Sequence, residues 1–488
     1  MLRSSRVLVS FFCLSLAALL ALLTGVAAAG PADQVPITIK SKDAADLFVK
    51  ARNQMELNHT EKAYDLFSQA VAKDSDFALG HLYKAATASE TEDFNAELAK
   101  AIELAPKASP GEQKLISAMR AIFIENNRVK HREIFEQLAS EFPKDARVLG
   151  CLSSTYDNLA EYDKEIAACD KALAVEKGFF PAYQSLGYVY SLKEQFDKAE
   201  AAFKNYLRLC PKEANSYDNL ADLYRRTGKF DQALEHYRDA FKLDPTYLTS
   251  QYKIGTTLAF MDKFDEARQA LQKSMDMEVK PAYKVYDQEA IARTHIYAGD
   301  IARCMEAADK AVRMAGELGL PEEVPGIHET KAFTYLAANE LDQAEASTGD
   351  LLKSLENPDL PPVVKQNNSA AATYLQACIA AGRKDFKAAL AKAHEYKAQV
   401  EAIKNPVFQK YPSSRYGHIA LLQGEYPKAV ELFGQGYQED PYFLYHSAVA
   451  KEKAGDAAGA KELYKKVANW NRDTFSFALF RKKAAAKI

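Results

Sequence analysis

A short pattern of aromatic, small and proline residues repeats every 34 positions along the middle of the chain. In residues 182–212 the pattern consists of Tyr183, Leu186, Gly187, Tyr190, Ala199, Phe203 and Pro211. The same kinds of residue stand 34 positions later, at Tyr217, Leu220, Ala221, Tyr224, Ala233, Tyr237 and Pro245. Five consecutive units keep this register without an insertion. A fixed period of this length predicts one structural unit that is used many times.

The spacing within a unit predicts a helical hairpin. Leu186 and Tyr190 lie one turn apart on one face of a first helix, and Phe203 faces them from a second helix. Ala199, near the start of the second helix, allows the two helices to cross closely. The equivalent small residues are Ala233, Ala267, Ala344, Ala389, Ala429 and Ala460. Such a hairpin buries both of its apolar faces only by stacking on neighbouring hairpins.

This 34-residue pattern resembles the tetratricopeptide repeat, with Tyr183 or Tyr217 in the place of the family's tryptophan. The resemblance implies an all-α fold, a right-handed superhelical solenoid of about twelve helical hairpins with a C-terminal capping helix. The units cover nearly all of residues 41–470. The resemblance also implies a concave surface, lined by the first helices, that binds a protein or peptide partner.

The repeats divide the chain into predicted parts. Residues 41–280 form the regular half of the solenoid, and residues 281–470 form an irregular half in which the unit spacing widens to about 37–45 residues. Longer helices and loops would explain the wider spacing, and the alternative is a hinge near residue 280. Residues 471–488 are predicted to form the capping helix and a basic tail, with Phe475, Leu479 and Phe480 on one side.

The N-terminal segment has the features of a secretory signal peptide, which we assign to residues 1–29. Arg3 and Arg6 precede an apolar run over residues 7–26, and three alanines end at Ala29, where we expect cleavage. Residues 30–40 are predicted to be a short linker. The protein would then be exported, as a periplasmic or secreted protein, and the alanine-rich sequence favours a bacterial cell envelope. The apolar run is also long enough to span a bilayer, so the alternative is a membrane-tethered assembly factor with an uncleaved first helix.

Charge and motifs exclude several classes of function. The 63 Lys and Arg residues are balanced by 66 Asp and Glu residues, which argues against a nucleic-acid partner. The sequence lacks an H-E-x-x-H zinc motif, and Ser185 lies outside a G-x-S-x-G motif. We therefore expect no catalytic residues, no cofactor and no metal site. An enzyme whose activity lies within residues 281–440 is the less favoured alternative.

The candidate binding residues lie on first helices, between the packing positions. They are Gln184, Tyr188, Ser191, Asp218, Asp222, Arg225, Arg226, Tyr252 and Thr256. Polar groups with interleaved rings suit an extended peptide or a partner helix. The alternative is an internal role, in which Tyr188 and Tyr252 pack between helices and the two arginines pair with Asp218 and Asp222. From these features the sequence predicts a non-enzymatic scaffold that binds a protein segment in its groove.

Overall fold

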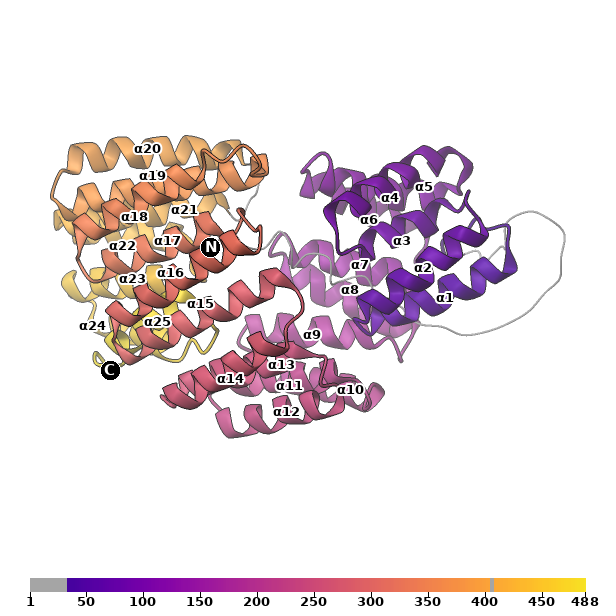
Figure 1. Ribbon diagram of the computed structural model, residues 1–488, viewed down its shortest axis with the longest axis horizontal. Coiled ribbons are helices and arrows are strands. Elements are labelled where there is room, and N and C mark those ends of the chain that lie inside the picture. The colour runs from indigo at the N-terminus through magenta and orange to yellow at the C-terminus, as the bar shows by residue number, and fades with distance from the viewer. Residues whose placement is uncertain (1–32, 404–407) are drawn as a thin grey trace. The chain divides into compact units, whose positions relative to one another are not determined.

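The computed structural model describes residues 33–403 and 408–488. Within these ranges the chain forms 25 α-helices and no β-strand. The first 24 helices pair as twelve consecutive hairpins, and α25 follows the last pair (Figure 1). The prediction of an all-α array of about twelve hairpins is therefore confirmed. The predicted signal peptide, residues 1–29, lies outside the described residues.

The chain divides into two compact units, one ending at Leu220 and the other running from Ala221 to Ile488. Among its described residues, the first unit contains ten complete α-helices and a 3₁₀ helix at Ala105–Lys107. Its helices are α1 (Lys42–Glu56), α2 (Thr60–Lys73), α3 (Ala78–Thr87), α4 (Thr91–Leu104), α5 (Pro110–Phe123), α6 (Arg128–Glu141), α7 (Ala146–Asp157), α8 (Tyr162–Val175), α9 (Phe180–Leu192) and α10 (Phe196–Leu209). The division falls inside α11 (Ala214–Arg226).

The second unit continues the hairpins and ends with the unpaired helix. Its helices are α12 (Phe230–Leu243), α13 (Leu248–Phe260), α14 (Phe264–Met277), α15 (Pro281–Ala298), α16 (Ile301–Glu317), α17 (Val324–Ala337), α18 (Leu341–Ser354), α19 (Pro362–Gly382), α20 (Phe386–Ala402), α21 (Tyr411–Gln423), α22 (Tyr426–Gln435), α23 (Pro441–Lys453), α24 (Ala457–Ala468) and α25 (Phe475–Ala485). Helices of 17 to 21 residues form the hairpins α15–α16 and α19–α20, whereas α9 to α14 have 13 or 14 residues. These longer helices account for part of the wider repeat spacing after residue 280.

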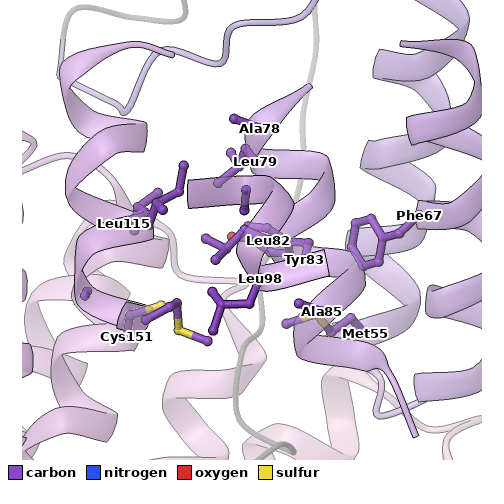
Figure 2. Packing of buried hydrophobic residues seen from close by; sticks show 14 of the residues in the cluster. Met55, Phe67, Ala78, Leu79, Leu82, Tyr83, Ala85, Leu98, Leu115 and Cys151 are labelled. Carbon is purple, nitrogen blue, oxygen red and sulfur yellow. The ribbon is translucent and has the colours of Figure 1, made fainter. Parts of the chain in front are cut away.

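The hairpins are stabilised by close crossings and by stacking on their neighbours. Ala199, Ala233 and Ala267 have no exposed surface, as expected where two helices cross. In the first unit, buried side chains from α1 through α8 form one continuous cluster. Figure 2 shows part of it, where Leu82, Leu98 and Leu115 of three successive helices lie near one another. The core therefore extends from hairpin to hairpin, because no single hairpin could bury both faces alone.

Candidate protein-binding surface

Four of the predicted binding residues lie in the first unit, on α9 and α11. Gln184, Ser191 and Asp218 are buried, with 5%, 9% and 1% of their surface exposed. Tyr188 is half-buried: its hydroxyl donates to Asn219 Oδ1 at 2.7 Å, and its ring meets the edge of Phe203. Tyr188 therefore packs between helices, and the residue as a whole stays partly exposed.

In the second unit, Asp222 lies at the centre of a hydrogen-bonded network. Its carboxylate accepts from Tyr237 Oη at 2.6 Å, Lys253 Nζ at 2.7 Å and Arg225 Nη2 at 3.3 Å. Arg225 also donates to Thr256 Oγ1 at 3.2 Å. Burial alone would raise the pKa of Asp222, but the charges of Lys253 and Arg225 hold it below its usual value. The structure thus brings Asp222, Arg225 and Thr256 together as one charged cluster.

The other two predicted residues, Arg226 and Tyr252, contact a segment from the far end of the chain. This segment is Asn469–Asp473, between α24 and α25, and we call it the C-terminal clasp. Arg226 Nη1 donates to the backbone carbonyls of Asn469 and Trp470, and its guanidinium lies 5.0 Å from the centre of the Trp470 indole. Tyr252 donates its hydroxyl to Asp473 Oδ2.

Arg293 of α15 completes the contacts with the clasp. Its Nη2 lies 2.9 Å from Asp473 Oδ2 and 2.7 Å from Tyr252 Oη. Both charged side chains are nearly buried, with 11% of Arg293 and 8% of Asp473 exposed. Burial would raise the pKa of Asp473, but Arg293 and the Tyr252 hydroxyl hold it below its usual value. Asp473 is therefore a charged carboxylate at neutral pH, bound by α13 and α15.

Sequence reasoning did not find Arg293, Trp470 or Asp473. Arg293 lies in the middle of α15, where the 34-residue register has already been lost. Trp470 carried a usable signal: it is the only tryptophan of the chain, and it stands outside the repeat helices. Although Trp470 lies in a connecting segment, its side chain is buried, with 3% of its surface exposed. A buried tryptophan in a connecting segment indicates that the segment is packed against something.

A second extended segment lies on the first unit. Within residues 33–40, which were predicted to be a linker, backbone N–H groups donate to carboxylates of three successive repeats. The bonds run from Lys40 to Asp74 at 2.7 Å, from Thr38 to Glu112 at 3.0 Å and from Val35 to Asp145 at 3.1 Å. The three acceptors stand at or near the start of α3, α5 and α7.

A cysteine and a histidine lie close together in the second unit. Cys378 Sγ lies 3.7 Å from His418 Nδ1, and both side chains are buried. Burial raises the pKa of Cys378 to about 11 and lowers that of His418 to about 4. The pair is therefore a neutral thiol and a neutral imidazole at pH 7, and not an activated thiolate.

An open pocket of about 300 Å³ lies beside the turn between α13 and α14. Its lining mixes acidic and basic side chains, including Asp262, Arg268 and His295. In the part of the chain that the structure describes, no three His, Cys, Asp or Glu side chains are arranged to hold a metal ion. Over the same residues, no helix combines the length and the apolar character needed to cross a membrane.

Comparison with known proteins gives one match to a family model. Residues 182–246 match the model described as tetratricopeptide repeat. No curated protein matches the sequence. The match covers α11 and α12 completely, together with most of α9 and all of α10, which are the most regular hairpins.

Several solved structures are similar to parts of the chain. YrrB, described as a TPR protein with an unusual peptide-binding site, is 21% identical over 39% of this chain and 96% of its own, with a TM-score of 0.28. MamA from Desulfovibrio magneticus RS-1 is 18% identical over 34% of this chain and 94% of its own, with a TM-score of 0.31. A tetratricopeptide repeat protein from Parabacteroides merdae is 17% identical over 51% and 98%, with a TM-score of 0.36.

Proposed function

Because the chain folds as an array of helical hairpins and residues 182–246 match the tetratricopeptide repeat family, we propose that it is a non-enzymatic scaffold whose first helices bind an extended segment of a partner protein in the cell envelope. Stacked helical repeats present extended surfaces of the kind that such proteins use for binding. The proposal excludes a catalytic role for the irregular half of the array.

One observation carries the proposal: first helices of this array already hold a non-helical piece of polypeptide, the clasp. Arg226 of α11 donates to two backbone carbonyls of the clasp, and Tyr252 and Arg293 bind its carboxylate. Contacts to backbone carbonyls do not depend on the ligand's sequence, whereas a buried charge pair does. The combination is the one expected of a surface that recognises a protein segment.

Export to the envelope rests on the sequence of residues 1–29, with a basic start, an apolar run and an Ala-x-Ala end. The five cysteines of the described residues are all free and buried. They are packed as small apolar side chains and are compatible with an oxidising compartment, because none is exposed to a second thiol.

The proposal is tested by photo-crosslinking in the native envelope. A photoreactive phenylalanine derivative replaces Tyr188, a half-buried ring on α9, so that the replacement keeps a similar shape. The matched control carries the same group at Ala167, an exposed position on the second helix α8. We expect a discrete covalent adduct with another protein from position 188 and none from position 167.

The two positions also define the outcome that overturns the proposal. Adducts of equal yield at positions 188 and 167 would indicate random collisions, and no adduct at position 188 would remove the first-helix face as the binding surface. Circular dichroism of both purified variants, compared with that of the unmodified protein, verifies that the substitutions leave the helices intact.

A further inference from the structure

The clasp contacts the second unit in the way that a bound peptide would. Its backbone is held by Arg226, which donates to the carbonyls of Asn469 and Trp470, and Asn471 Nδ2 lies 3.5 Å from the Arg226 carbonyl. The two partners are more than 240 positions apart in the sequence. The two bonds from Arg226 place no requirement on the side chains of the segment, whereas the contact of Asn471 is made by its side-chain amide.

Two other side chains of the clasp, Trp470 and Asp473, also make specific contacts. The Trp470 ring is buried and lies close to two guanidinium groups, with Arg226 at 5.0 Å and Arg472 at 5.3 Å from its centre. A cation over the face of an indole is the most favourable arrangement of this kind. The Asp473 carboxylate is bound by Arg293 and Tyr252. An aromatic residue and an acidic residue three positions later are therefore the two anchors.

The backbone between the anchors adds a third requirement. Asn471 has a φ of 49°, in the left-handed region. Asparagine and glycine adopt this conformation readily, and β-branched residues do so at a considerable cost. Asparagine or glycine is therefore favoured directly after the aromatic residue of a segment that binds in the same way, and β-branched residues are disfavoured.

The charges on the receiving helices agree with an acidic ligand. Arg225, Arg226, Lys253 and Arg293 all lie on α11, α13 and α15. Arg225 and Lys253 are paired with Asp222, within the unit itself. The carboxylate that pairs with Arg293 comes from the clasp. An incoming segment must therefore bring its own carboxylate to this position.

We propose that Arg226, Tyr252 and Arg293 form a binding site for a non-helical protein segment with the pattern aromatic, preferably Asn or Gly, any residue, Asp or Glu, and that the C-terminal clasp is its resident occupant in cis. This inference rests on the proposed function and adds the chemistry of the ligand. A partner segment with this pattern displaces the clasp, while α25 stays packed in the core through Phe477 and Phe480.

The test uses the full chain and a fluorescent synthetic peptide with the sequence of residues 467–476, VANWNRDTFS. In the variant Trp470→Ala/Asp473→Ala the cis anchors are removed and the receiving residues are kept. We expect this variant to bind the peptide at least tenfold more tightly than the unmodified chain does, measured by fluorescence anisotropy. A peptide with asparagine in place of its aspartate should bind at least tenfold more weakly.

A triple variant that adds Arg293→Met is the matched control for the site, and we expect it to lose the preference for the aspartate peptide. The inference is overturned if the folded double variant does not bind the peptide, or binds both peptides equally. It is also overturned if the double variant loses its helical circular dichroism, because the clasp would then be a fixed part of the core. Position 188 lies in the other unit. If crosslinking at position 188 gives an adduct but the peptide does not bind, only this inference is rejected.

Discussion

At the scale of single residues, the hairpins depend on side chains that are small or absent. A Cβ atom added at Gly187 would lie 2.4 Å from the Phe203 ring, which is 1% exposed. Ala199, on the helix that carries Phe203, has no exposed surface. The repeat pattern predicted both positions, because a small residue recurs there at a fixed spacing. Small residues are required at these two positions because α9 and α10 approach each other closely.

Gly187→Ala should therefore destabilise the protein. The added methyl group must displace a buried ring, and overpacking of this kind costs about 1–3 kcal/mol. Gly349→Ala in α18 is the control, because a Cβ atom there meets nothing within 4 Å. It should raise the free energy of unfolding by about 0.5–1 kcal/mol. Urea denaturation of both variants measures the difference, and equal effects would show that α9 and α10 do not cross closely.

One buried acid makes stability depend on pH. Glu165 of α8 is 3% exposed, and its Oε2 atom has no hydrogen-bond partner. Burial, with a smaller contribution from Asp157, raises the pKa of Glu165 to about 9. The carboxyl group stays protonated in the folded state, but in the unfolded state it ionises above its ordinary pKa. Because the unfolded state loses its proton first, the free energy of unfolding falls as the pH rises from about 4.5 to about 9.

Glu165→Gln should remove this loss, because the amide does not titrate. Relative to the unmodified protein, the variant should gain about 2–4 kcal/mol in the free energy of unfolding between pH 5 and pH 8. Urea denaturation at the two pH values measures the change. The exposed Glu133→Gln is the control and should show little change. A Glu165→Gln variant whose advantage is the same at both pH values would contradict the neutral, buried carboxyl group.

At the scale of helices, sequence periodicity predicted which positions lie on one face but not what covers that face. Asp222, Arg225 and Thr256 were placed correctly on first helices, yet their side chains bind one another and Lys253. Arg226 and Tyr252 are covered by the clasp. A 34-residue pattern contains no information about a contact between residues more than 200 positions apart. The repeats were therefore predictable, and the return of the C-terminal segment was not.

The last helix is stabilised by aromatic packing within the second unit. Phe477 is fully buried and meets Phe260 of α13 and Tyr297 of α15 at ring-centre distances of 5.3 Å and 6.0 Å. The sequence pattern predicted a capping helix whose apolar side consists of Phe475, Leu479 and Phe480. Of these, Phe480 is buried with 3% of its surface exposed, and Phe475 and Leu479 are not among the buried residues. The buried face of α25 therefore differs from the predicted one and includes Phe477, Phe480 and Ala484.

Phe477→Ala should lower the free energy of unfolding by about 3–5 kcal/mol, because truncation leaves a cavity between α13, α15 and α25. Ile488→Ala, at a position 46% exposed, is the control and should change stability by less than about 0.5 kcal/mol. Thermal denaturation followed by circular dichroism compares the two variants. Similar melting temperatures would contradict a structural role for α25.

At the scale of the whole chain, repeated hairpins provide surfaces on which extended segments lie. Residues 33–40 run along three repeats of the first unit, and the clasp lies against α11, α13 and α15 of the second. Both segments are bound through backbone groups, by carboxylates in one case and by an arginine in the other. The same chemistry would serve a segment of another protein.

The proposed export predicts which residue begins the mature protein. Cleavage after Ala29 should leave Gly30 as the first residue of the protein isolated from its native source. Edman degradation or mass spectrometry of the N-terminal peptide measures this directly. Ala29→Leu, which removes the small residue before the cleavage site, should block processing. A mature protein that starts at Met1 or Leu2 would instead support the membrane-tethered alternative.

If first helices of the repeats bind a partner segment, the complex should protect the amide groups of these helices. Hydrogen exchange measures this most directly, in the full chain alone and in complex with the protein captured at position 188. We expect slower exchange on α7 and α9 in the complex and unchanged exchange on the second helices α8 and α10. Protection confined to α8 and α10 would contradict it.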